Sequence, residues 1–229
     1  MIRFLSVLWA GFLYGSTLVF FNLLNATEAT ILGGDPYNFS PAMCGLAYLS
    51  PTLFSVFFFF IAGTLSDFLK VHIAKKRNGS SIPEDRLWVL MVYMILGFLA
   101  SIGWGVGAYY GAHWMALVIS MGVLGGLNVF GCTSACTYCS DTYHELDTEA
   151  MVVVIVIRNI MSFAASYGLT DWVLNMGYKN AFISSGCILF FCNSTFLIMR
   201  IPGPYWRAKT RYSYWKLVEF DRDTFYGSD

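Results

Sequence analysis

Charged residues are scarce in this chain. Lysine, arginine, aspartate and glutamate make up 12% of its 229 residues, whereas a soluble domain carries about 25%. Hydrophobic residues make up 57%, so there are too few polar side chains to cover a surface that faces water. The net charge is zero, which gives no basic field of the kind that attracts nucleic acid, and we expect no nucleic-acid partner. This composition indicates a protein that is dissolved in lipid.

The sequence also lacks the motifs of common enzymes. Its glycine-rich run at 122–126 lies in an apolar stretch without a lysine, so it does not predict a phosphate-binding loop. Cys132, Cys136 and Cys139 share one helical face, but a structural zinc site normally takes four ligands, and His144 lies beyond the helix end. We therefore expect no metal, no cofactor and no enzymatic activity.

Long apolar stretches, by contrast, dominate the sequence. Six of them are long enough to cross a hydrocarbon core of about 30 Å, which takes about 20 helical residues. They are continuous rather than alternating, which favours helices over a barrel. We predict an all-α membrane protein with six transmembrane helices in a 3+3 bundle over residues 1–205, followed by a tail over 206–229. The predicted spans are about 2–24, 41–63, 87–110, 112–138, 150–174 and 181–199.

The cations are distributed unevenly between the predicted connections. Twelve lysines and arginines fall at the N-terminus, between the second and third spans, or after the sixth, whereas the connections after the first, third and fifth spans hold only Lys179. Cytoplasmic connections carry the excess of lysine and arginine, so both termini and the 64–86 loop are predicted to be cytoplasmic. The acidic connection between the fourth and fifth spans is also cytoplasmic, because acidic residues count little in this rule. We expect a multi-pass protein of the plasma membrane.

The first predicted external connection contains two N-glycosylation sequons, which begin at Asn25 and Asn38. This connection is short and lies close to the bilayer. An alternative interpretation makes the first stretch a cleaved signal peptide, but its apolar run is longer than the usual core of about 7–15 residues. Cleavage there would leave the remaining topology unchanged.

Glycines spaced by four residues recur in three predicted helices. Small residues at this spacing let helix backbones approach closely in lipid. They predict helix packing rather than a function, and the short turns at 111 and 175–180 predict antiparallel neighbours. Three helices, a link and three more fit the inverted repeat of many transporters. The glycines are Gly11 and Gly15, then Gly103, Gly107 and Gly111, then Gly122 and Gly126.

The 63–88 segment is the most informative motif. A solvated cytoplasmic loop would explain its cations but not its Gly-x-x-Ser-Asp start. It reads Gly63-Thr64-Leu65-Ser66-Asp67, then Lys75-Lys76-Arg77, then Pro83-Glu84-Asp85-Arg86-Leu87-Trp88. With Gly63, Ser66, Asp67, Lys76 and Arg77, it resembles the cytoplasmic loop signature of the major facilitator superfamily, in its looser second-half form.

Other segments resemble the same family. The segments 35–40, 45–48 and 137–143, together with Arg158-Asn159, are similar to fungal members related to drug:proton antiporters and to histidinol or polyamine transporters. The resemblance covers residues 1–205. It matches only the carboxy-terminal half of these transporters, which consist of two six-helix halves. The stronger signature and the antiporter motif of the first half have no counterpart here.

The resemblance implies transport of a small organic solute, driven by protons, by rocking of one bundle against another. A single half would then need a separate six-helix half or a second copy as its partner. The alternative is a truncated membrane protein that inserts into lipid without transporting anything.

Arg158 is a cation about 12 Å into the fifth predicted helix. Such a charge costs about 2.5–3.5 kcal/mol at a helix centre, so it should face protein or water. Arg158 either lines a solute cavity or forms a gating ion pair with Asp141 or Glu145, or its side chain reaches back to the cytoplasmic interface. Our hypothesis is that the ion pair closes the cytoplasmic side.

Other polar side chains lie within or near the spans. Asn128, Tyr138 and Asn159, with Tyr14 and Asn22, either face the cavity or form hydrogen bonds between helices. Glu28 and Asp171 lie near the external ends, where they act as interface residues or as proton carriers.

Overall fold

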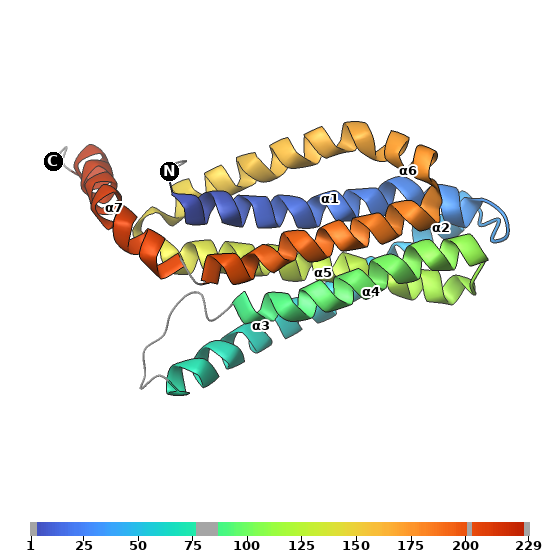
Figure 1. The fold of residues 1–229 in the computed structure, drawn as a ribbon, viewed down its shortest axis with the longest axis horizontal. Helices are drawn as coiled ribbons and strands as arrows, with labels where there is room; N and C mark the ends of the chain where they lie inside the picture. Colours follow the sequence, from blue (N-terminus) through green and yellow to red (C-terminus); the bar gives the residue numbers. More distant parts are fainter. Residues whose placement is uncertain (1–3, 77–86, 201–202, 227–229) are drawn as a thin grey trace.

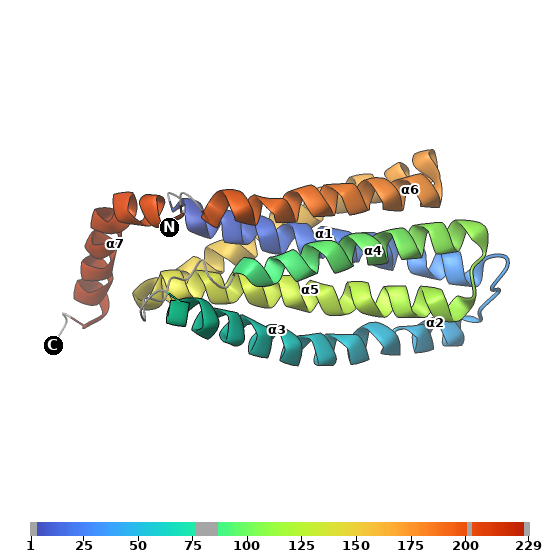
Figure 2. The ribbon, with the colours of Figure 1, turned by 60° about the horizontal axis from the view of Figure 1, so that its bottom comes forward.

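The computed structural model describes residues 4–76, 87–200 and 203–226, which form helices and no strand. The long helices run side by side along one axis, and the last helix leaves the bundle at one end (Figures 1 and 2). Five helical segments are long and apolar enough to cross a membrane. The chain is therefore a helical bundle suited to lipid.

The helix that contains the first predicted span continues beyond residue 24. Helix α1 covers Leu5–Gly33, because no proline or glycine interrupts the chain between residue 24 and Gly33. Residues 34–40 then turn the chain. Helix α2, Pro41–Ala47, begins after Ser40, whose side chain accepts a hydrogen bond from the Met43 amide.

Helices α2 and α3 together occupy the second predicted span. Helix α3 covers Leu49–Lys76 and is separated from α2 by a break at Tyr48. Pro51 causes this break, since it has no amide hydrogen to donate to the Ala47 carbonyl. The helix also continues well beyond the predicted end at residue 63.

Helices α4 and α5 form an antiparallel hairpin. Helix α4 covers Val89–Tyr110 and α5 covers Trp114–Thr142. Gly111 ends α4 in the left-handed region at φ 62°, where glycine is favoured. A short helical turn, η2 (His144–Leu146), follows α5.

Helix α6, Asp147–Arg200, consists of two arms that meet at Gly177. Gly177 has φ 74° and ψ 156°, a conformation that is essentially restricted to glycine. The chain reverses there, and the second arm runs back along the bundle in the direction opposite to the first (Figure 1). Helix α7, Gly203–Tyr226, begins soon after and contains residues 206–226 of the predicted tail.

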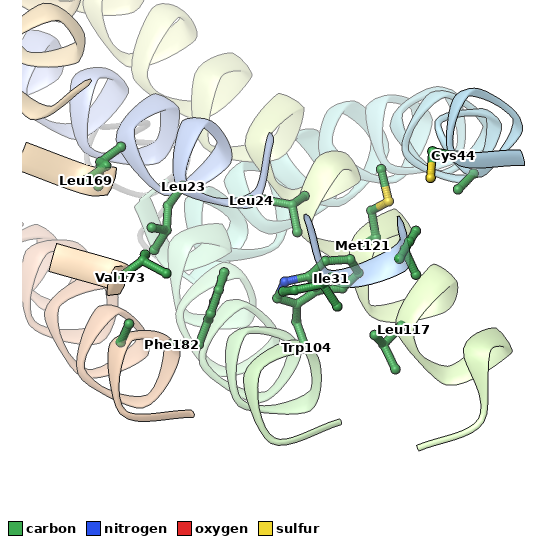
Figure 3. Close-up of a cluster of buried hydrophobic side chains, with 13 residues drawn as sticks. Leu23, Leu24, Ile31, Cys44, Trp104, Leu117, Met121, Leu169, Val173 and Phe182 are labelled. Carbon is green, nitrogen blue, oxygen red and sulfur yellow. The ribbon is translucent and has the colours of Figure 1, made fainter. Parts of the chain in front are cut away.

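The core is divided into clusters of buried apolar side chains between the helices. In one of them Trp104, which is fully buried, lies near Leu24, Ile31 and Met121 (Figure 3). The outside is also apolar, and Leu53, Phe60 and many similar side chains are exposed. An exposed apolar surface of this extent suits contact with lipid or with another bundle.

Several of the glycines that were predicted to mark helix packing lie where two helices touch. A Cβ atom on Gly11 would lie 2.9 Å from Ile157 Cβ, and one on Gly126 would lie 2.9 Å from the Phe54 carbonyl oxygen. These distances are shorter than real Cβ contacts allow. The glycines therefore set how closely α1 approaches α6 and how closely α5 approaches α3.

Candidate functional site

Arg158, in the first arm of α6, lies against α1. Its Nη1 donates a hydrogen bond of 2.6 Å to the Tyr14 hydroxyl, and its Cζ lies 4.8 Å from the centre of the Tyr14 ring. Its Nε and Nη2 donate to Asn159 Oδ1 at 3.2 and 3.0 Å. Among the described residues, Arg158 forms no ion pair with Asp141 or Glu145, contrary to our hypothesis. The close approach of α1 at Gly11 brings a tyrosine within reach of the guanidinium instead.

Beyond Arg158, the same arm of α6 carries a polar groove. The groove has a volume of about 420 Å³ and is lined by Asn159, Ser162, Phe163, Ser166 and Tyr167. These positions recur every three or four residues, so they follow one face of the helix. Sequence reasoning identified Asn159 but missed the serines, although their spacing is visible in the sequence.

One hydrogen bond joins this groove to α1. Asn22 Nδ2 donates to Ser162 Oγ at 2.7 Å, and Ser166 Oγ donates to the Ser162 carbonyl at 2.8 Å. Tyr14, Asn22, Arg158 and the groove thus form a continuous polar band, which we call the α1/α6 polar band. Polar groups at this depth in a lipid-embedded bundle are costly unless they face protein or water.

Asn128 and Tyr138 of α5 lie apart from this groove. Tyr138 is fully buried, and its ring meets Trp9 edge to face at 5.4 Å. Asn128 Oδ1 is buried and has no hydrogen-bond partner among the described residues. Tyr138 therefore packs between helices, Asn128 is half-buried, and neither residue lines the groove.

The loop signature lies at the end of α3. Gly63, Ser66 and Asp67 line a pocket of about 160 Å³ together with three polar residues of α5, namely Thr133, Ser134 and Thr137. A Cβ atom on Gly63 would meet nothing within 4 Å, so this glycine is not needed for packing inside the bundle. Lys76 ends α3, and Arg77 lies outside the described residues.

An ion pair that the sequence did not predict joins the C-terminal part of α3 to the last turn of α5. Lys70 Nζ lies 3.1 Å from Asp141 Oδ2. Asp141, which was expected to pair with Arg158, is therefore engaged by α3. The partners are 71 residues apart, so no local pattern reveals them.

The two sequons differ in their surroundings. Asn25 lies inside α1, not in a connection, and accepts a hydrogen bond from the Tyr48 hydroxyl at 3.3 Å. Its sequon threonine, Thr27, is buried, which leaves no extended segment there. Asn38 is exposed in the turn before α2, and its use for glycosylation stays a prediction.

Comparison with known proteins identifies relatives among fungal transporters. The chain is 24% identical over 216 residues to an uncharacterised MFS-type transporter of Schizosaccharomyces pombe, covering 92% of this chain and 37% of the relative. It is 27% identical over 222 residues to the protein HOL1 of Saccharomyces cerevisiae, covering 95% and 37%. It is 24% identical over 193 residues to the MFS antiporter QDR3 of Candida albicans, covering 84% and 27%.

No family model and no solved structure matches the chain. The chain spans about 37% of the length of the first two relatives. Its long apolar helices and its relatives both support the conclusion that it is a multi-pass membrane protein. Over most of its length, the chain is therefore a homologue of fungal transporters of the major facilitator superfamily.

Proposed function

We propose that this chain is one six-helix side of a proton-coupled transporter for a small organic solute. The observation that carries the proposal is the α1/α6 polar band. A bundle that only had to sit in lipid would gain nothing from an arginine and a row of serines on an accessible helix face. A solute path between two bundles would provide the water and the partner that such a face needs.

Six membrane crossings are part of the proposal. A membrane crossing needs about 20 helical residues, and each arm of α6 is longer than that. The reversal at Gly177 would return the second arm through the bilayer. With five long helical segments, one of which consists of two arms, we infer six crossings. Both ends then lie on the cytoplasmic side, as the lysine and arginine distribution favours.

Proton coupling would use Glu28. Only 2% of this residue is exposed, and its Oε1 has no hydrogen-bond partner among the described residues. Burying a carboxylate without a cation is costly, so burial favours the neutral acid. A carboxyl that is neutral when buried and ionised when water reaches it can carry a proton across a conformational change.

A partner bundle completes the proposed transporter. The chain covers about 37% of its first relatives, and the open space beside Gly63 leaves room for a second helix at the loop signature. The partner is either a separate first half or a second copy of this chain. The mass of the purified complex in mild detergent distinguishes these two from a lone bundle, which would support the non-transporting alternative.

Thiol labelling tests the solute path directly. Ser166 and Ile188 are both accessible and lie at equal distances along the chain from Gly177, so they sit at similar depth on the two arms of α6. In membranes, Ser166→Cys should react with a water-soluble maleimide, whereas Ile188→Cys should not. Mass spectrometry of the labelled peptides separates these sites from the native cysteines. Equal labelling of the two positions would contradict a water-filled path along the first arm.

A further inference from the structure

Helix α7 turns away from the bundle axis. It begins within a few residues of the end of α6, and Figure 2 shows its first turns leaving the end of the bundle and its later turns running across the long axis of the other helices. If α6 crosses the membrane, α7 lies along the membrane surface. Its position is therefore that of an interfacial helix.

One side of α7 rests on the bundle. The Glu145 amide donates a hydrogen bond of 3.2 Å to the Tyr214 hydroxyl, and the Tyr214 ring lies 5.7 Å from that of Tyr143. Val218, one helical turn further, is 5% exposed. These contacts fix which face of α7 points away from the bundle.

The other side combines exposed aromatic and basic side chains. Tyr205, Tyr212 and Trp215 are 65%, 81% and 45% exposed, and at about 100° per residue they share a face with Lys209 and Lys216, which are also exposed. The exposed Arg211 lies at the edge of this face, toward Val218. From Gly203 to Val218 the sequence contains no acidic residue. Within the described part of the chain, Arg211 and Lys216 form no ion pair with a carboxylate.

We propose that this face of α7 binds the anionic phospholipid headgroups of the leaflet in which α6 ends. Tyrosine and tryptophan rings favour the headgroup level, where one end is apolar and the other is hydrated. Lysine and arginine beside them pair with lipid phosphate and with the negative surface of the inner leaflet. The alternation of rings and cations on one face suits this surface better than it suits bulk water.

Lipid binding by α7 would also act on the bundle. Tyr214 lies on the opposite face and contacts the chain between α5 and α6. Anionic lipid would keep α7 parallel to the membrane surface and thereby keep Tyr214 in contact with the connection between α5 and α6. The proposal does not depend on transport, because it requires only that α6 ends at the membrane surface.

Hydrogen exchange of the full chain in nanodiscs tests the proposal. With phosphatidylserine present, amides of 203–218 should exchange on the order of tenfold more slowly than in pure phosphatidylcholine, and high salt should remove the difference. The variant Lys209→Ala/Arg211→Ala/Lys216→Ala should lose the effect of phosphatidylserine. The matched control Lys75→Ala/Lys76→Ala, at the end of α3, and the charge-keeping Lys209→Arg/Lys216→Arg should both retain it.

Three outcomes would overturn the proposal. Equal exchange in the two lipids would show that α7 is held by the bundle alone. Protection by free phosphate in neutral lipid equal to that by phosphatidylserine would show a soluble-anion site. Protection that appears only when another protein is added would show a protein-docking face instead.

Discussion

The ammonium group of Lys70 lies 3.1 Å from the Asp141 carboxylate and joins the C-terminal part of α3 to the last turn of α5. Both side chains are partly buried, at 29% and 19% exposure, so solvent screens the pair less than it would screen a pair on the surface. It connects the helix that carries the loop signature to α5, close to the end of α5. The contact therefore couples α3 to α5 at this end of the bundle.

Replacement of Lys70 by alanine should lower stability by about 0.5–1 kcal/mol, because a partly exposed ion pair is worth little more. A double-mutant cycle of Lys70→Ala and Asp141→Asn, measured by thermal unfolding in detergent, isolates the coupling energy. The coupling should vanish in the matched cycle with Lys75→Ala. A coupling energy near zero for Lys70 itself would mean that the ion pair does not form in solution.

The Gly126→Ala variant should be destabilised by about 1–3 kcal/mol, since its Cβ would meet the Phe54 backbone, which cannot rotate away. Gly168→Ala is the matched control, because its Cβ would meet nothing within 4 Å. It should stay close to the unmodified chain. Thermal unfolding of both variants in the same detergent gives the comparison, and equal losses would contradict the close contact of α5 with α3.

Tyr14→Phe removes the acceptor of the 2.6 Å hydrogen bond from Arg158. We expect a loss of about 1.5–3 kcal/mol, the usual range for a hydrogen bond to a charged group. Arg158→Lys should not substitute for arginine, because an ammonium cannot reproduce the planar contacts with Tyr14 and Asn159. If Arg158→Lys and Arg158→Gln both unfold like the parent chain, Arg158 has no structural role in the polar band.

Glu28→Gln should change stability by less than about 1 kcal/mol, because an amide resembles the neutral acid that burial favours. Glu28→Lys should cost several times more, since it places an unpaired cation in the same site. A hydrophobic carbodiimide, which reacts with protonated carboxyls, should label Glu28 in the intact chain more readily than the exposed Asp171. Peptide mass spectrometry reads out both positions. Preferential labelling of Asp171 would remove Glu28 as the proton carrier.

The helical regions follow from sequence because hydrophobic runs and helix-breaking residues are local. Gly111 and Gly177 stand where the two predicted turns occur, and the glycines at 11 and 126 mark real close approaches. Helix α1 extends past residue 24, where the first span was predicted to end, since a drop in hydropathy ends a span but not a helix. The hydrogen bonds of the helix continue to Gly33.

The partners of the site residues could not be predicted in this way. Arg158 meets Tyr14 across 144 residues of sequence, and the pairing depends on how α1 packs on α6. Helical periodicity gives the face on which a side chain lies, but not the helix that faces it. The serines at 162 and 166 follow a local pattern and were within reach of sequence reasoning, whereas the Lys70–Asp141 pair was not.

The reversal at Gly177 decides the topology of the chain, and labelling from the outside of intact cells tests it. Lys179→Cys, next to the reversal, should react with a membrane-impermeant maleimide in intact cells. Lys209→Cys, on α7, should react only after the cells are permeabilised. This result would place the two ends of the second arm of α6 on opposite sides of the membrane. Equal labelling of both positions before permeabilisation would show that this arm does not cross, and the account of a six-crossing bundle would be wrong.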